Sequence, residues 1–317
     1  MKKCPICDSS STKFVNDLYD DRYGYPGVYK LLLCNNCNHK YLDVDFTNEQ
    51  ITDLYTNYYP RTERSIDSFQ PLEYTKGIRG WWSGDYRAFA AVPENVRVLD
   101  IGCGFGESLA YHKKRGCDVY GVDADANLQR VADKFNFNVK IGSFDAKNYS
   151  ENFFDYVTMD QVIEHFANPA EVLKGINHIL KPGGFLVFTT PNSNGFSAKW
   201  NRKKWINWHT PYHLQHFSRK SFKILGKASG FKLVSLKCVT SSEWARYQQI
   251  HNIIFPLQAG KKAAFWSTGI EITDSQQKRL NKVNRFHKTR LNHLLTRLFD
   301  AIGLGDNFIG IYKKVQS

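Results

Sequence analysis

Short apolar segments alternate with helical patterns through the middle of the chain. Apolar residues fill four short runs, and the stretches between these runs have the spacing of amphipathic helices. The four runs are Val96–Ile101, Val119–Val122, Tyr156–Met159 and Phe185–Thr189. Strands that alternate with helices are typical of a parallel sheet with crossover helices. With a last run at Phe308–Tyr312, the pattern predicts an α/β fold with a doubly wound sheet.

The flanking stretches differ from this central pattern. Residues 1–57 are polar and rich in turns, and residues 58–92 are aromatic and predict a connector that becomes a helix before Pro93. Residues 241–306 are basic and mostly helical in pattern, with an apolar series that ends at Leu298. The expected parts are an N-terminal unit (1–57), a connector (58–92), an α/β domain (93–240 with 307–317) and a helical insert before the last strand (241–306).

Composition limits the class of protein. Of 317 residues, 42% are hydrophobic and 15% are aromatic, which is enough for a sizeable core and excludes disorder as the overall state. No apolar run reaches the roughly 18 residues that a membrane-spanning helix needs. The start, Met1–Cys7, lacks the apolar core of a signal peptide. We therefore expect a cytoplasmic protein, free or peripheral to a membrane.

Positive charge gathers in the second half of the chain. From Ala198 onward there are 22 Lys and Arg against 5 Asp and Glu, whereas residues 1–197 carry 21 against 25. A basic half points to a polyanionic partner, meaning a phosphate-bearing substrate, nucleic acid or an anionic membrane surface. Solubility alone is the alternative.

Four of the seven cysteines form two matched pairs. Cys4 and Cys7 enclose two residues, and so do Cys34 and Cys37. Each pair places two thiolates on one tight turn, and two such turns complete a tetrahedron around Zn²⁺. Because residues 1–57 have little core, the metal would supply folding free energy. We expect a structural zinc site, with disulfides as the alternative; four thiolates leave no open position for catalysis.

A glycine turn follows the first strand of the α/β region. Asp100 lies near the end of that strand, and the turn contains Gly102, Gly104 and Gly106. Glycines let the backbone approach a ligand closely, with helix N–H groups pointing at it. A dinucleotide-binding turn would have its third glycine at Glu107, and the carboxylate of Asp100 would repel a pyrophosphate. The same carboxylate suits a cationic amino-acid ligand.

A second acid ends the next strand. Asp123 follows the run Val119–Val122, where doubly wound nucleotide folds place an acid that accepts both ribose hydroxyls. Asp100, the glycines and Asp123 together describe a site for a nucleoside with an amino-acid tail, which is S-adenosylmethionine (SAM).

With these motifs the chain resembles the class I SAM-dependent methyltransferases. The resemblance spans roughly residues 93–240 and the last strand, and it includes three further motifs. These motifs are Ile141–Asp145, Asn152–Val157 and Ile179–Asn192. The resemblance implies a Rossmann-like, mostly parallel sheet of seven strands. It also implies that Ser143, Phe144 and Asp145 lie by the adenine.

The segment after the fourth strand resembles the ubiquinone-biosynthesis O-methyltransferase branch, which has an acidic pair and then Glu-His. The resemblance implies that Asp160 and Gln161 lie by the sulfonium and its tail. In that branch the acids and the His are associated with a divalent metal and with deprotonation of a hydroxyl. Gln161 replaces an acid, which argues against the metal. His165 remains a candidate general base with a pKa near neutrality; the alternative is that Glu164 and His165 cap the next helix.

The N-terminal layout resembles bacterial zinc-ribbon methyltransferases. The shared features are the cysteine pairs, the stretch Tyr55–Tyr59 and the block Trp208–Ser218 after the fifth strand. The histidines of this block, with Trp205 nearby, could form a substrate-binding wall, in which His213 contacts the acceptor and shares a helical face with His216. The alternative is that the block is the entry to the next helix and its aromatic residues belong to the core.

The resemblance predicts in-line methyl transfer from SAM, at oxygen, to a small-molecule, glycan or lipid-linked acceptor, with a histidine as the base. The basic insert would be a lid or an acceptor-binding element facing phosphate or a membrane. Two other classes stay open. An RNA methyltransferase is favoured by the zinc unit and the positive charge, although the aromatic signature of enzymes that flip a base is missing. The other is a non-catalytic zinc-binding scaffold.

Overall fold

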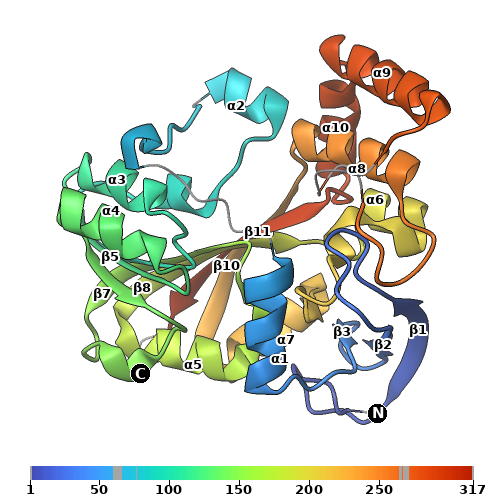
Figure 1. Ribbon diagram of the computed structural model, residues 1–317. Coiled ribbons are helices and arrows are strands. Elements are labelled where there is room, and N and C mark those ends of the chain that lie inside the picture. The colour runs from blue at the N-terminus through green and yellow to red at the C-terminus, as the bar shows by residue number, and fades with distance from the viewer. Residues whose placement is uncertain (1, 60–65, 76, 264–265, 267–270, 316–317) are drawn as a thin grey trace.

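The chain forms one large and one small sheet (Figure 1). The computed structural model describes residues 2–59, 66–75, 77–263, 266 and 271–315. The large sheet has seven strands in the order β10-β11-β8-β7-β4-β5-β6. Their bounds are β4 Arg97–Ile101, β5 Asp118–Asp123, β6 Asn138–Ile141, β7 Phe154–Asp160, β8 Leu180–Pro191, β10 Phe231–Val239 and β11 Asn307–Lys314. This confirms the predicted α/β fold with its seven-stranded, Rossmann-like sheet.

Five neighbouring strands of the large sheet, β4 to β8, are parallel. Only β11 runs the other way, because it is antiparallel to both β8 and β10. The carboxyl ends of parallel strands meet at one edge of a sheet, which is where open α/β folds bind ligands. That edge collects Asp123 from β5 and Asp160 from β7, and the turn after β4 leaves from it.

Helices cover both faces of this sheet: α3 and α4 lie along one face, and α5 and α7 lie against the other (Figure 1). Their bounds are α3 Glu107–Lys113, α4 Asn127–Phe135, α5 Pro169–Ile179 and α7 Arg219–Ala228. Ser218 begins α7 with a capping box, as the alternative interpretation of the Trp208–Ser218 block predicted. Asn168 caps α5, so the suggested capping role of Glu164 and His165 is wrong.

One aliphatic and aromatic core lies against the sheet and continues into the N-terminal unit, and a second core packs between the sheet and helices α3 and α4. Phe188 fills the space over β11, where Gly310 is required: a Cβ there would lie 2.1 Å from the Phe188 ring. Leu32 and Cys34 of the N-terminal unit belong to the same cluster as Leu99 of β4. The N-terminal unit therefore packs on the α/β domain through buried apolar contacts.

The fourth strand of the small sheet, β9, is distant in sequence from the other three strands. The sheet has the order β1-β2-β3-β9, and every pair in it is antiparallel. Its bounds are β1 Thr12–Leu18, β2 Tyr29–Cys34, β3 Lys40–Leu42 and β9 Gln215–His216. Trp205 and Trp208 pack on Leu18, Leu31 and Leu42 of this sheet. These tryptophans are core residues, so the predicted substrate wall does not include them.

The remaining helices lie in the N-terminal unit, the connector, the segment after β8 and the insert. In the N-terminal unit, α1 is followed by the π-helical turn Leu54–Tyr58. In the connector, the residues just before Pro93 form only the 3-10 turn Ala88–Ala91. The helix bounds are α1 Asn48–Asp53, α2 Gly77–Ser83, α6 Phe196–Asn201, α8 Ser242–Ile254, α9 Asp274–Lys288 and α10 Leu291–Ala301. Across the described residues, every helix is too short or too polar to cross a bilayer.

Candidate active site

The three glycines of the turn between β4 and α3 differ in the space around them. All three glycines have positive φ, at 74°, 56° and 90° for Gly102, Gly104 and Gly106. A Cβ at Gly102 would lie 2.4 Å from Val162, whereas one at Gly104 would meet no atom within 4 Å. Gly142, just after β6, is equally open. The backbone thus borders open space at Gly104 and Gly142, on both sides of the end of β5.

Asp123 lies between these two open glycines. Its Oδ2 accepts the Gly104 N–H (2.8 Å), and its Oδ1 accepts the Asp125 N–H (2.8 Å). The Gly142 N–H donates to the Asp123 backbone carbonyl (2.8 Å). A carboxylate offers about four lone-pair positions, so each oxygen of Asp123 can accept a further bond.

Asp100 is buried beneath the turn and turns inward. Its oxygens accept hydroxyl hydrogen bonds from Ser108 and from Thr158 (2.7 Å for Thr158). Burial raises the pKa of Asp100 to about 6, although both hydroxyls act in the opposite direction. As placed here, Asp100 ties α3 and β7 to the turn, and a direct contact with a ligand stays a prediction.

Asp160 ends β7 and lies beside the side chain of Arg87, a residue that the sequence did not identify as part of the site. The Arg87 Nε donates to Asp160 Oδ2 (2.8 Å), which brings the connector to the carboxyl edge of the sheet. The Thr189 hydroxyl donates to the other oxygen of Asp160. Gln161 is exposed, has a φ of 60°, and donates its side-chain amide to the Thr189 hydroxyl (3.0 Å). Arg87 belongs to no motif in the sequence. Its role is visible only in the fold, which brings it to Asp160.

The segment after β6 forms an exposed border of the same edge. Asp145 accepts the Lys147 N–H (3.0 Å) as the cap of a 3-10 turn, and Ser143 is exposed. The half-buried ring of Phe144 stacks on Tyr149 with ring centroids 6.2 Å apart. These residues are near Gly142 in the chain, but their expected contact with adenine stays a prediction.

Two of the candidate histidines lie together past β7. The rings of His165 and His213 meet edge to face, with centroids 4.7 Å apart. His213 Nδ1–H donates to the Asn207 carbonyl (2.9 Å), so its lone pair is on Nε2. The predicted helical face shared with His216 is wrong, because His213 lies outside any helix and His216 pairs with Lys40 in the small sheet.

Burial sets the protonation of this cluster. It lowers the pKa of His165 to about 4, so the imidazole is neutral at physiological pH, in contrast to the expected pKa near neutrality. It raises the pKa of Glu164 to about 8, even though Glu164 accepts a hydrogen bond from Thr190 (2.9 Å). Glu164 is therefore mostly a neutral acid at pH 7, and the whole cluster carries little charge.

Tyrosines from the N-terminal part of the chain surround these histidines. The Tyr55 hydroxyl lies 3.3 Å from His165 Nδ1. Tyr23 and Tyr59 both contact the ring of Tyr212, with centroids 5.6 and 5.3 Å away. The stretch Tyr55–Tyr59 was visible in the sequence, but no periodicity indicated that it would lie next to His165.

Carboxylate and imidazole atoms in the cluster could also hold a cation. Glu164, His165 and His213 place ligand atoms within 4.8 Å of one another. The Oε1 of Glu164 has no hydrogen-bond partner within the described ranges. Two imidazoles and one carboxylate are a familiar ligand set for divalent metals.

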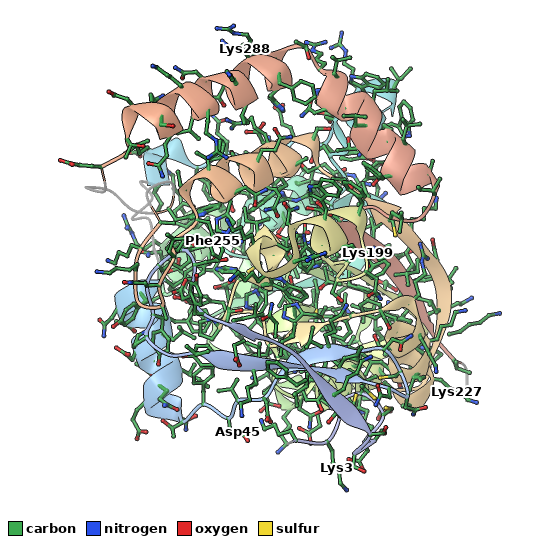
Figure 2. The ribbon with its side chains drawn as sticks, turned by 90° about the vertical axis from the view of Figure 1, so that its right-hand side faces the viewer. Lys3, Asp45, Lys199, Lys227, Phe255 and Lys288 are labelled. Carbon is green, nitrogen blue, oxygen red and sulfur yellow. The ribbon has the colours of Figure 1, made fainter. Side chains whose placement is uncertain are left out.

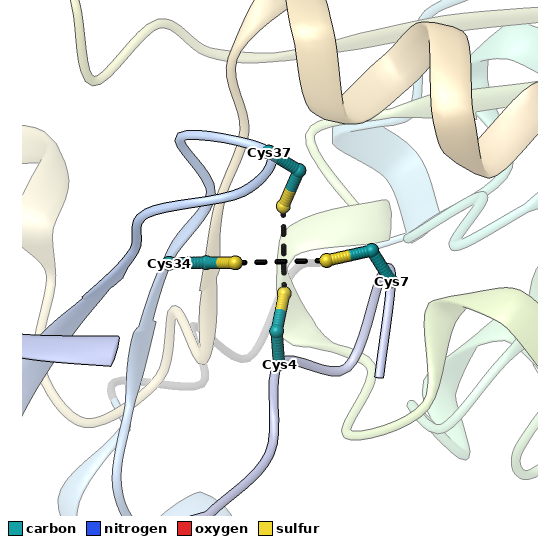
Figure 3. Close-up of side chains that lie close together, drawn as sticks. All are labelled: Cys4, Cys7, Cys34 and Cys37. Atoms are coloured by element: carbon teal, nitrogen blue, oxygen red, sulfur yellow. Dashed lines mark hydrogen bonds between the residues drawn. The ribbon is translucent and has the colours of Figure 1, made fainter. Parts of the chain in front are cut away.

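The four paired cysteines converge on one point (Figure 3). The Cys4 and Cys37 sulfurs are 3.5 Å apart, as are those of Cys7 and Cys34. Disulfides, which need about 2.05 Å, are absent from this cluster. Tetrahedral zinc with Zn–S bonds of about 2.3 Å would hold the sulfurs about 3.8 Å apart. The thiols therefore fit a zinc ion.

Comparison with known proteins gives one family and a set of partial relatives. A family model described as "Methyltransferase domain" matches residues 74–236. A ubiquinone biosynthesis O-methyltransferase of Coxiella burnetii is 35% identical over 157 residues, covering 42% of this chain and 66% of the relative. One from Acinetobacter baylyi is 30% identical over 134 residues, covering 40% and 55%. The chain thus spans just over half to about two thirds of these relatives.

The solved structures that are similar to this chain have low sequence identity to it. A putative methyltransferase complex with the Trm112 activator from Haloferax volcanii has a TM-score of 0.47 and 17% identity, covering 75% of this chain and 91% of that one. Phosphoethanolamine N-methyltransferase 2 of Haemonchus contortus, bound to SAM, has a TM-score of 0.45 and 19% identity, covering 72% and 50%.

The burial of Asp100 predicts a pH dependence of folding. Its folded pKa of about 6 exceeds the ordinary value of 3.8, so the folded protein binds the proton more tightly than the unfolded chain. The stability contributed by that proton is present below about pH 4 and is lost as pH rises through 6. The free energy of unfolding of Asp100→Asn should not show this loss. Relative to wild type it should rise by up to about 3 kcal/mol between pH 4 and pH 7. Urea unfolding at both pH values measures the difference.

The exposed Asp133→Asn, on α4, controls for the loss of one negative charge. A parallel response of Asp100→Asn and wild type to pH would contradict the assignment.

Proposed function

Because the chain belongs to the methyltransferase domain family, we propose that it is a SAM-dependent methyltransferase that binds its cofactor at the carboxyl ends of β4, β5 and β6. When bound, SAM supplies an activated methyl group on a sulfonium. The observation that carries this proposal is the open space beside Gly104 and Gly142 on either side of Asp123. There the backbone can approach a nucleoside, and the remaining lone pairs of Asp123 can accept both ribose hydroxyls.

At the same edge of the sheet, the protein offers a pair of charges that is complementary to the amino-acid end of SAM. A zwitterion carries an ammonium and a carboxylate, and the Arg87–Asp160 ion pair offers the opposite charges within 2.8 Å of each other. Both side chains are partly exposed, so a ligand can take the place of their mutual contact. In this role Arg87 would bind the ligand carboxylate and Asp160 the ammonium.

The acceptor side of the proposed site is the histidine–tyrosine cluster. His165 is half-buried and its neutral imidazole can accept a proton. His213 is more deeply buried and its ring holds the His165 ring edge-on, so it has a positioning role beside the base. An in-line transfer needs the nucleophile within about 3 Å of the methyl carbon, and removal of a hydroxyl proton by His165 would activate it.

Unsatisfied polar atoms in the cluster favour a hydroxylated, ring-shaped acceptor. Glu164 Oε1, His209 Nε2 and the Tyr212 hydroxyl are buried without a hydrogen-bond partner in the part of the chain that the structure covers. Buried polar groups are normally paired, so a ligand that supplies hydroxyls would complete them. The aromatic neighbours suit a flat ring. Two partial relatives are named ubiquinone biosynthesis O-methyltransferases, which supports methylation at oxygen of a small molecule.

A structural zinc ion is the second cofactor that we propose. The four cysteine sulfurs would complete its shell, leaving no position for substrate. The knuckle Cys34–Cys37 joins β2 to β3, so the ion would brace the small sheet.

Asp123→Ala should weaken SAM binding. The variant loses charge-assisted hydrogen bonds worth roughly 1.5–3 kcal/mol each, which corresponds to about a tenfold or greater rise in Kd. Isothermal titration calorimetry with SAM measures the change. Asp118→Ala removes a carboxylate from the other end of β5, where it pairs with Arg97, and should leave Kd unchanged. Unchanged affinity in Asp123→Ala would refute the ribose assignment.

His165→Ala should lower turnover by about 10²-fold or more while SAM affinity persists, because it removes the proton acceptor and leaves the cofactor site intact. Radiolabelled methyl transfer to a panel of hydroxylated aromatic compounds measures turnover. His178→Ala, an exposed histidine on α5, is the control. Normal turnover in His165→Ala would remove this residue from the mechanism.

Cys34→Ser should release zinc and loosen the small sheet, because one of four ligands is lost. Metal content by mass spectrometry should fall from one zinc per chain towards zero. Cys117→Ser, a buried cysteine outside the cluster, should retain its zinc. One zinc per chain in Cys34→Ser would count against a four-thiolate site.

A further inference from the structure

The helix α10 is packed with its polar side inward. Asn292, Thr296 and Arg297 are buried, and they bond to Ser242, Thr240 and the Trp81 carbonyl. The leucines lie on the opposite side, and each of these residues is 47–56% exposed. These residues are Leu291, Leu294, Leu295 and Leu298, and Ile302 follows them with 67% exposed. A helix normally turns its apolar stripe to the core, whereas this stripe is left uncovered by the residues that the structure describes.

Two other helices extend this apolar surface. Arg297 fastens α10 to the carbonyl of Trp81 in α2, whose Ile78 and Trp81 are 78% and 47% exposed. On the other flank, Phe299 stacks on Phe196 of α6. Trp200 stacks on Phe196 in turn and is 74% exposed. We call the exposed apolar residues of α2, α6 and α10, with Ile302, the α10 face.

The charges beside the α10 face are almost all positive. Lys288 ends α9, Arg290 directly precedes α10, Arg79 lies on α2 and Lys199 on α6, and all four are exposed. Figure 2 labels Lys199 and Lys288. The one carboxylate on these three helices is Asp300, which is turned inward to Thr240 and Arg297. Leucine and tryptophan flanked by lysine and arginine are typical of segments that lie in a lipid–water interface.

We propose that the α10 face docks on the surface of an anionic lipid bilayer. Its leucines and tryptophans would enter the headgroup boundary, and its lysines and arginines would meet lipid phosphates. A second copy of the chain is a poorer occupant, because it would bring a second set of cations against the first.

The α10 face lies near the proposed active site, so docking on a membrane would bring that site close to the bilayer. Arg87 follows α2 and reaches the carboxyl edge of the sheet at Asp160, and β11 begins at that edge directly after α10. A bilayer on the α10 face would therefore lie beside the proposed site. If the proposed function holds, an acceptor with a lipid tail could enter from the membrane.

Vesicle sedimentation of the full-length protein tests the proposal. Binding to vesicles of equal parts phosphatidylglycerol and phosphatidylcholine should be at least about tenfold tighter than binding to phosphatidylcholine alone, and it should weaken as salt is raised. Leu294→Gln with Leu298→Gln should lower binding by about tenfold or more, since it removes apolar area from the interface. Because both leucines are exposed, the melting temperature should not change.

The matched control is Val28→Gln with Ile51→Gln, which removes two exposed apolar side chains from the N-terminal unit, at the other end of the molecule (Figure 1). This control should bind vesicles as wild type does. Equal binding by the leucine variant, or no preference for anionic vesicles, would overturn the proposal. So would a lipid-free dimer that the leucine variant splits into monomers. Calorimetry with SAM on the leucine variant should give the wild-type Kd, which separates failed docking from a failed cofactor site.

Discussion

The pairing of β3 with β9 is the constraint on which the site depends. Lys40 and Tyr41 pair with His216 and Gln215, and this short ladder is the only one, in the part of the chain described, that joins the N-terminal unit to the α/β domain. Hydrogen bonds on either side reinforce it: the Leu42 N–H donates to the Leu214 carbonyl (3.0 Å), and the Ser218 hydroxyl donates to the Cys37 carbonyl (2.9 Å). A metal ion bound by the four cysteines would therefore also help to fix the position of the histidine block.

Two groups of residues with different electrostatic character border the proposed site. The first group contains Asp123, which accepts backbone hydrogen bonds, and the partly exposed ion pair of Asp160 with Arg87; these residues suit a charged nucleoside with an amino-acid tail. In the second group, burial favours the neutral forms of His165 and Glu164, with tyrosines around them. A neutral, water-poor surface strengthens each hydrogen bond made to an acceptor. The N-terminal unit supplies part of that surface, so in this account it is a component of the site as well as a metal-binding module.

The sequence predicted local features well and distant contacts poorly. The glycine turn, the acid at the end of β5 and the paired cysteines have fixed spacings whose chemistry can be inferred without a fold. Arg87 and Tyr55 gain significance only from partners 73 and 110 residues away in the chain. The leucines of α10 show a further limit: their spacing predicts a helix but does not show which side faces the protein, and here buried Asn292, Thr296 and Arg297 decide it.

Hydrogen exchange of the full-length protein with and without zinc tests the central claim most directly. If the cysteine cluster holds the histidine block through β3 and β9, removing zinc with a chelator should speed exchange in residues 29–42 and 209–216 together. Exchange in β4, within the α/β core, should stay slow. Unchanged protection of residues 209–216 after complete loss of the metal would contradict the account.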